Sequence, residues 1–329
     1  MSTTDSAADR APASAPGLSP VGPLGPLGPP VAAGVGEARG TGDTATPREY
    51  VLTLSCADRL GIVHAVSGFL AEHSCNIVDS QQFSDRQGGC FFMRVHVQAE
   101  SPEVTLDDLQ VGFAPVGAEF GMDWQVRDLA VRQRLLVLVS KQDHCLNDLL
   151  YRCRVGAIPA DIAAVVSNHP DAGPMVESVG LPFHHLPVTP ETKREQEERI
   201  LDLVTEHQVD LVVLARYMQV LSHELCEKLV GRAINIHHSF LPSFAGAKPY
   251  HQAYERGVKL IGATAHYVTE VLDEGPIIEQ EVARVDHSLT PAKLAAVGRD
   301  LESLALARAV TWHLEHRVIL NGGRTVVFR

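Results

Sequence analysis

The stretch Arg134-Leu135-Leu136-Val137-Leu138-Val139-Ser140 decides the fold of most of this chain. It is a strand-sized apolar run, and from here onward similar runs alternate with helical patterns. Strands that alternate with helices are typical of a parallel, doubly wound α/β sheet. Further strands are expected at residues 161–167, 182–186, 210–215, 233–236 and 260–267.

The segments between these strands carry helical patterns. Helices are expected at residues 144–154, 191–207, 222–230, 250–256 and 291–317. Two short final strands, at 318–320 and 325–328, are separated by Asn321-Gly322-Gly323, which predicts a hairpin. Residues 131–329 are therefore predicted to form one mostly parallel, Rossmann-like domain.

Residues 48–130 show a different pattern. Apolar and polar side chains alternate over 50–55, and residues of 62–73, Val63 among them, share one helical face. Strands expected at 76–84, 91–97 and 122–128 and a helix at 105–116 complete the order βαββαβ. This order is that of a ferredoxin-like unit. The chain is thus predicted to hold two α/β domains.

Composition excludes several classes of protein. A formal charge of −12 argues against a nucleic-acid surface, and no apolar run approaches the roughly 18 residues of a membrane span. Residues 1–47 are rich in Ala, Gly and Pro and lack the basic start and apolar core of a signal peptide. We expect this tail to be disordered. The six cysteines form no C-x-x-C pair, which indicates free thiols in a cytoplasmic protein.

Polar side chains gather where one predicted strand ends, in Asn235-Ile236-His237-His238-Ser239-Phe240-Leu241-Pro242. Asn235, His237 and Ser239 alternate, so their side chains should point to one side. The strand at 260–267 can lie beside this one, and the loop that follows it would bring Asp273 close to Asn235 and His237. A carboxylate favours the protonated form of a nearby imidazole, and an amide N–H can stabilise an oxyanion. Together these groups could act on an acyl carbon.

The N-terminal unit resembles the ACT domain, a small regulatory module that typically binds amino acids. The resemblance rests on Asp58-Arg59-Leu60-Gly61-Ile62-Val63 and on Asn76-Ile77-Val78-Asp79. It implies an effector loop that includes Asp58, Gly61, Ile62 and Asn76. The free N–H groups of such a strand-to-helix turn could hold a carboxylate. A structural or oligomer-forming unit without a ligand is the alternative.

The C-terminal domain resembles the folate-dependent formyltransferases over about residues 134–317. The matching pattern joins 235–242 with Gly262-x-Thr264-x-His266 and with Asp273-x-Gly275-x-Ile277-Ile278-x-Gln280. The resemblance implies a 10-formyltetrahydrofolate site with Asn235, His237 and Asp273 as catalytic residues. It also implies folate contacts from two loops, namely Arg216, Tyr217, Met218, Gln219, Val220, Leu221, Val271 and Leu272. The alternative for the first loop is a helix start that packs Met218, Val220 and Leu221 into the core.

The formyl acceptor is decided by neighbouring residues. No glycine-rich phosphate loop follows the strand at 134–140, although Lys141 could reach an anion. Three motifs, at 144–150, at 235–242 and in Gly246-Ala247-Lys248-Pro249-Tyr250-His251-Gln252-Ala253, together with the domain order, resemble the formyltetrahydrofolate deformylases. The resemblance implies hydrolysis to formate and tetrahydrofolate, which would supply formate for purine biosynthesis and balance folate pools. His238, His144 and Lys141 are candidate deformylase-specific residues.

Other assignments compete with this one. Transfer of the formyl group to an amine such as glycinamide ribonucleotide is the alternative activity, and a non-catalytic sensor of amino acids or folate is the alternative class. A metal site of His237, His238, His251 and His266 is disfavoured, because adjacent residues of a strand point to opposite faces. We therefore expect no metal and no cofactor, a folate substrate, a possible amino-acid effector and a homo-oligomer.

Overall fold

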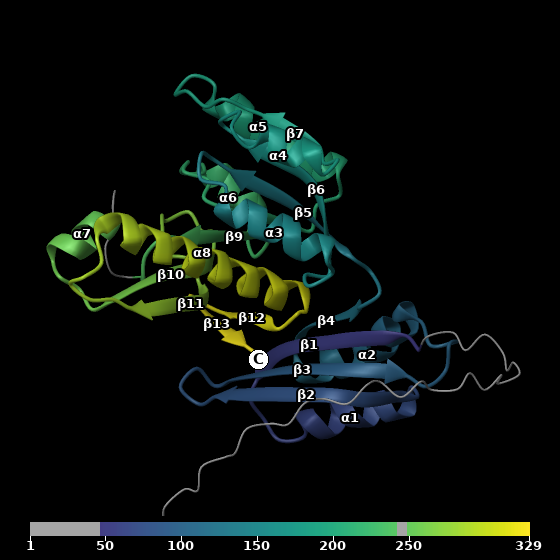
Figure 1. Cartoon of the computed structure of the whole chain (residues 1–329). Coiled ribbons are helices and arrows are strands. Elements are labelled where there is room, and N and C mark those ends of the chain that lie inside the picture. The colour runs from purple at the N-terminus through teal and green to yellow at the C-terminus, as the bar shows by residue number, and fades with distance from the viewer. Residues whose placement is uncertain (1–46, 242–248) are drawn as a thin grey trace, which may run out of the picture. The chain divides into compact units, whose positions relative to one another are not determined.

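Figure 1 shows the computed structural model of the chain, which describes residues 47–241 and 249–329. These residues form two β-sheets with their helices and a terminal hairpin. Nearly all of the predicted tail at 1–47 lies outside the described residues, as do Pro242 and positions 246–248 of the last motif. Among the helices that can be described, none is long and apolar enough to cross a membrane.

The N-terminal sheet has four antiparallel strands in the order β2-β3-β1-β4. One apolar core lies between this sheet and its two helices and includes Tyr50, Val66, Val95 and Phe113. The predicted order βαββαβ is confirmed. The elements are β1 (Glu49–Ala57), α1 (Ile62–Glu72), β2 (Cys75–Asp85), β3 (Cys90–Ala99), α2 (Leu106–Phe120) and β4 (Asp123–Asp128).

One residue of α1 was wrongly placed by the sequence pattern. Ile62, Val66, Phe69 and Leu70 are buried, whereas 41% of Val63 is exposed. Successive residues of a helix are rotated by about 100°, so Val63 lies away from the face that Ile62 begins. The apolar face of α1 is therefore narrower than predicted.

The C-terminal sheet has seven strands in the order β11-β10-β9-β8-β5-β6-β7. The strands from β9 to β7 pair in parallel, whereas β10 and β11 run antiparallel to their neighbours. The predicted doubly wound, mostly parallel fold is confirmed. The strands are β5 (Gln133–Val139), β6 (Ala160–Ser167), β7 (Phe183–His185), β8 (Leu211–Leu214), β9 (Ala233–His237), β10 (Leu260–Tyr267) and β11 (Ile277–Arg284).

Helices cover both faces of this sheet (Figure 1). Leu135, Val137 and Val139 of β5 pack in one core with side chains of α3 and α8, and Leu136 and Leu138 pack in another with those of α5 and α6. This two-sided burial explains the continuous apolar run of β5. The helices are α3 (His144–Arg154), α4 (Gly173–Ser178), α5 (Lys193–Glu206), α6 (His223–Lys228), α7 (Pro249–Glu255) and α8 (Pro291–Leu314), and the hairpin strands are β12 (Val318–Asn321) and β13 (Arg324–Val327).

Two elements were not predicted. The helix α4 has only six residues, too few for an apolar period to show. The strand β11 lies at the sheet edge, and its burial does not alternate, because Ile278 and Glu279 are both buried. Glu279 lies 3.3 Å from a guanidinium nitrogen of Arg329 and 3.8 Å from one of Arg308, so its charge is compensated. Such a strand lacks the pattern that identifies a half-buried strand in a sequence.

Strand β3 is joined to the C-terminal residues by polar contacts. The guanidinium of Arg94, of which only 3% is exposed, donates to the carbonyl of Glu315 just after α8, at 3.2 and 3.0 Å. At the end of β2, Asp85 accepts from Asn321 at 3.0 Å and from Arg324 at 3.1 Å. A buried guanidinium without a partner is costly, so these contacts connect the N-terminal sheet to the end of α8.

We predict that stability falls as the pH falls from about 6.5 towards 5. Burial, followed by neighbouring positive charge, lowers the pKa values of both His313 and His316 to about 4. The unfolded chain, with ordinary histidine pKa values, binds protons in this range before the folded chain does. The contribution of these two histidines to the free energy of unfolding is therefore fully present above the histidine pKa of the unfolded chain. It is lost as the pH decreases towards their pKa in the folded chain, by about 1 kcal/mol or more.

Urea unfolding followed by circular dichroism at pH 7.5, 6 and 5 measures this loss. The double variant His313→Gln, His316→Gln should show a smaller dependence than the native chain, with part of the remainder due to the lowered pKa values of His238 and His266. An unfolding free energy that is as high at pH 5 as at pH 7.5 would contradict the prediction.

Candidate active site

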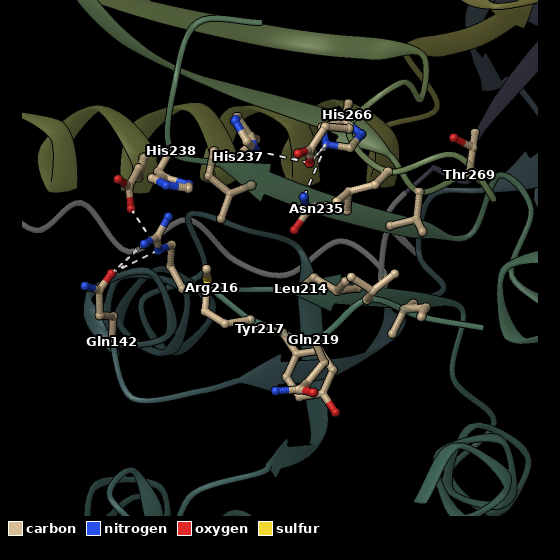
Figure 2. A pocket seen from close by; sticks show the side chains of 18 of the residues that line it. Gln142, Leu214, Arg216, Tyr217, Gln219, Asn235, His237, His238, His266 and Thr269 are labelled. Atoms are coloured by element: carbon tan, nitrogen blue, oxygen red, sulfur yellow. Dashed lines mark hydrogen bonds and ion pairs between the residues drawn. The ribbon is translucent and has the colours of Figure 1, made fainter. Parts of the chain in front are cut away.

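A cavity of about 550 Å³ opens at the carboxyl ends of β5, β8 and β9. Its walls come from the loops after β5 and β8, from β9, from residues 268–273 and from α7 and α8. This is the edge at which doubly wound sheets bind their ligands. In Figure 2, Gln142, Arg216 and His238 lie on one side of Asn235, and Thr269 lies on the other. The cavity thus has two different ends.

The three predicted residues meet in this cavity. Asn235 and His237 belong to β9, and Asp273 comes from the loop after β10. The Nδ1 atom of His237 lies 3.1 Å from Oδ1 of Asp273 (Figure 2). Hydrogen bonding by His237, opposed by partial burial, keeps the pKa of Asp273 below its ordinary value. The carboxylate is therefore ionised at neutral pH.

His266 joins this group, although the sequence indicated it only as part of a motif. Its Nδ1 lies 2.8 Å from the carbonyl oxygen of Tyr267, so Nδ1 carries a proton and donates it to that oxygen. Burial keeps the pKa of His266 below its ordinary value, which leaves Nε2 as an acceptor. Nε2 accepts from Nδ2 of Asn235 at 3.2 Å. This bond orients the amide of Asn235 and leaves its second N–H for another acceptor.

Ser239 completes the surroundings of His237. Its hydroxyl lies 2.8 Å from Nε2 of His237, and its side chain is buried. A hydroxyl can donate or accept, so it can satisfy His237 in either protonation state. The distances resemble those of a Ser-His-Asp triad, but Ser239 does not line the cavity. We therefore interpret it as a positioning group rather than a nucleophile.

Small and polar residues of the motif fix the backbone around the site. The hydroxyl of Thr264 donates to the carbonyl of Ser239 at 3.0 Å and accepts from the amide of Leu241 at 3.1 Å. Gln280 donates to the same hydroxyl at 3.0 Å. A Cβ atom on Gly275 would lie 1.7 Å from the carbonyl oxygen of Tyr267, so only glycine fits there. The spacing of the motif thus reflects the packing of β9, β10 and β11.

The two predicted folate loops line one end of the cavity. Met218, Val220, Val271 and Leu272 are each more than half exposed, although they are apolar. A helix start that buries Met218 and Val220 is therefore the wrong alternative. Of the three residues in that alternative only Leu221 packs into the core, where Tyr217 of the same loop also lies. An apolar slot with backbone polar groups at its rim suits a flat ligand.

The other histidines differ from expectation. His237 and His238 do not point to opposite faces, because β9 ends at His237, and their ring centroids lie 5.0 Å apart beside the cavity. Burial, followed by the charge of Arg216, lowers the pKa of His238 to about 4, so it is neutral at pH 7. His251 is exposed and does not line the cavity. These four histidines therefore do not form one metal site.

The remaining predicted positions are distributed as follows. His144 lines a second cavity and binds Glu302 of the first at 2.7 Å, whereas Lys141 is exposed and lines neither. In the described residues, one group has metal-compatible spacing, namely His144, Cys145 and Glu302. Cys145 is fully buried, and burial raises its thiol pKa further from neutrality, which opposes ligation.

The predicted effector loop of the N-terminal unit has a defined turn. Gly61 precedes α1 with a φ of +98°, a conformation that favours glycine. The carboxylate of Asp58 accepts from the hydroxyl of Ser84 on β2. Ile62 is buried in the core, whereas Asn76 is exposed. Asp58 and Asn76 are thus accessible, but Ile62 supports the turn from inside.

Comparison with known proteins identifies the family. Residues 133–310 match the formyl transferase family, and residues 50–111 match the ACT domain. The formyltetrahydrofolate deformylase of Corynebacterium sp. (strain P-1) is 53% identical over 280 residues, which cover 85% of this chain and 98% of that protein. The chain belongs to the formyltetrahydrofolate deformylase family. Members of this family are hydrolases, and the predicted order of an ACT domain before a formyltransferase domain is confirmed.

Solved structures agree with this family assignment. The crystal structure of the formyltetrahydrofolate deformylase from Burkholderia mallei matches with a TM-score of 0.82 and 53% identity, over 86% of this chain and all of that one. A glycinamide ribonucleotide transformylase from Symbiobacterium toebii matches with a TM-score of 0.57 and 30% identity, over 60% of this chain and 95% of that one. The deformylase family thus shares its C-terminal fold with transferases.

We predict that Gly275→Ala displaces the loop that carries Asp273. The added Cβ atom meets backbone rather than a flexible side chain, so β10 or the loop has to move. A 1 Å misplacement of a reacting group can cost about 100-fold in rate. Gly323→Ala is the matched control, because its Cβ atom would meet nothing within 4 Å. Formate release and thermal unfolding of both variants measure the effect, and an unchanged rate for Gly275→Ala would contradict the assigned role of this glycine.

Proposed function

We propose that this chain hydrolyses 10-formyltetrahydrofolate to formate and tetrahydrofolate, using Asn235, His237 and Asp273. The observation that carries the proposal is the convergence of these three side chains at one cavity, with His237 and Asp273 in contact at 3.1 Å. Membership of the deformylase family supports the same reaction. The formate would serve purine biosynthesis, and hydrolysis would balance the folate pools.

The apolar end of the cavity is the proposed pterin site. Backbone groups of 216–221 and 271–272 would bind the ring edges, and Met218, Val220, Val271 and Leu272 would cover its faces. The formyl carbon then lies beside Asn235 and His237. This placement leaves the polar end of the cavity for the attacking water.

The proposed reaction has three steps. Water attacks the formyl carbon and passes a proton to Asp273, directly or through His237. The free N–H of Asn235 and protonated His237 stabilise the negative charge on the former formyl oxygen. The C–N bond then breaks, His237 or Asp273 returns a proton to the folate nitrogen, and formate leaves.

We predict that Asp273→Asn and His237→Ala lower kcat by about 10²–10⁴-fold, since each removes a general acid–base group. Folate binding should change little, because neither residue belongs to the apolar end. Formate release and binding of tetrahydrofolate are measured for each variant. Glu274→Gln is the matched control, as it makes the same change at an exposed neighbour. Substantial turnover by either site variant would contradict the assignment.

Transfer to an amine is the second candidate activity, supported by the similarity to a glycinamide ribonucleotide transformylase. The segment after β5 opposes it, because Ser140-Lys141-Gln142-Asp143 contains no glycine that would let the backbone close around a phosphate. Formate release with and without that acceptor separates the two activities. Formate production that requires the amine would favour transfer.

We propose further that residues 48–130 form the regulatory domain and residues 131–329 the catalytic one, with an amino acid bound at the loop of Asp58 and Gly61. Left-handed Gly61 leaves backbone N–H groups available at the start of α1, where a carboxylate is favourable. We also infer a homo-oligomer, since Ile77, Val78 and Phe83 are exposed apolar residues on the edge strand β2. Light scattering measures the subunit number.

Addition of single amino acids to the formate assay tests the effector site. We predict that one of them changes KM or kcat and that Asp58→Ala removes the response without altering the basal rate. Asp107→Ala, an exposed aspartate in the first turn of α2, is the control. The proposal is wrong if no amino acid changes the rate or if Asp58→Ala responds like the native chain.

A further inference from the structure

A polar cluster with buried Arg216 and Glu302 at its centre closes the end of the cavity opposite the apolar loops. It consists of Gln142, His144, Arg216, Tyr250 and Glu302, which we call the Glu302 cluster. Its members come from the loops after β5 and β8 and from α3, α7 and α8. Four of them line the cavity, and His144 lies behind Glu302. Sequence patterns did not indicate Glu302, which lies within the long helix α8.

Glu302 organises this cluster. Only 1% of the residue is exposed, and both carboxylate oxygens are engaged. Oε1 accepts from the hydroxyl of Tyr250 at 2.6 Å, and Oε2 lies 2.7 Å from Nε2 of His144 and 3.4 Å from Nε of Arg216. Burial raises the pKa of Glu302, but the bonds from His144 and the charge of Arg216 outweigh it, so the net pKa is lowered. The carboxylate is therefore ionised, and each of its oxygens already has a partner within the protein.

Arg216 and Tyr250 are held in place around it. Nε and Nη2 of Arg216 donate to the side-chain oxygen of Gln142 at 3.1 and 2.7 Å (Figure 2). The ring of Tyr250 packs on Gly298, where a Cβ atom would lie 2.0 Å from the phenolic oxygen. Removing one partner of a buried ion pair is costly. The side chains of the cluster are therefore fixed, and a ligand cannot easily displace them.

The Glu302 cluster lies at the end of the cavity from which the nucleophile would approach the formyl carbon. With the folate ring between the apolar loops, its formyl carbon lies beside Asn235 and His237, and the nucleophile enters from the side of His238 and Arg216 (Figure 2). Arg216 is paired with ionised Glu302 at 3.4 Å, so the two side chains form a fixed, charge-balanced wall at this end. Its buried Nη1 atom has no hydrogen-bond partner among the described residues. Water is small enough to satisfy such a donor beside these fixed side chains, whereas an amine with its substituent needs more volume.

We propose that the Glu302 cluster determines the acceptor, admitting water to the formyl carbon and excluding amines. The inference rests on the proposed function, because it concerns the second substrate of the same site. In the excluded reaction, the C–N bond to folate breaks, a C–N bond to the amine forms, and one proton passes from the amine to the folate nitrogen. The cluster prevents this reaction by occupying the volume that the substituent of an amine acceptor would need.

Competition between hydroxylamine and water tests the proposal. The full-length chain is supplied with 10-formyltetrahydrofolate and hydroxylamine, and formate and N-formylhydroxylamine are quantified separately. For the native chain, the formylated amine should not exceed its uncatalysed background, whereas formate should exceed its own. We expect Tyr250→Ala and Arg216→Ala to raise the ratio of formylated amine to formate by at least about tenfold, the usual scale of discrimination by pocket volume. Both products are corrected for the uncatalysed background, so the ratio of the products formed by the enzyme is independent of any general loss of rate.

Two further variants sharpen the test. Tyr254→Ala on the same helix is the control, because Tyr254 is 49% exposed and does not line the cavity; it should retain the native ratio. Tyr250→Phe keeps the ring and should raise the ratio less than Tyr250→Ala. Ratios in Tyr250→Ala and Arg216→Ala equal to that of the native chain overturn the proposal. Absence of formate from the native chain instead contradicts the proposed function, so the two failures are distinguishable.

Discussion

The contact between His237 and Asp273 is the interaction on which the proposed chemistry depends. Its 3.1 Å distance exists because β9 and β10 pair in one register, which sets Thr264 opposite His237 and His266 opposite Asn235. The loop after β10 then returns Asp273, whose φ is +60°, to the end of β9. Only Gly275 allows this loop to pass so close to Tyr267. The contact is thus the product of sheet register and one close backbone approach.

Each end of the cavity contributes a different physical property. The loops at 216–221 and 271–272 expose apolar surface that a flat ligand would cover. The Glu302 cluster presents fixed charges whose hydrogen-bonding groups are almost all used within the protein. His238 lies between them and stays neutral, because burial and Arg216 lower its pKa to about 4. Together these properties favour a second reactant as small as water.

The sequence predicted the fold and the three central residues because their signals are local. Alternating apolar runs identified β5 to β10, and the spaced motif identified Asn235, His237 and Asp273. It missed β11, whose edge position removes the alternation. It also missed Glu302, whose partners come from three other segments. The sequence pattern also placed His238 on the wrong face, because it does not show at which residue β9 ends. Contacts between segments that are far apart in the chain produce no periodic pattern in the sequence.

Hydrolysis in water labelled with ¹⁸O tests the central claim most directly. If water attacks the formyl carbon at this site, the formate released by the purified chain carries one labelled oxygen beside the original formyl oxygen. Mass spectrometry of the formate measures this incorporation, and Asp273→Asn supplies the background. Formate with a single ¹⁸O atom, formed well above that background, is the predicted result. Unlabelled formate, or no formate without an added amine, would contradict the account.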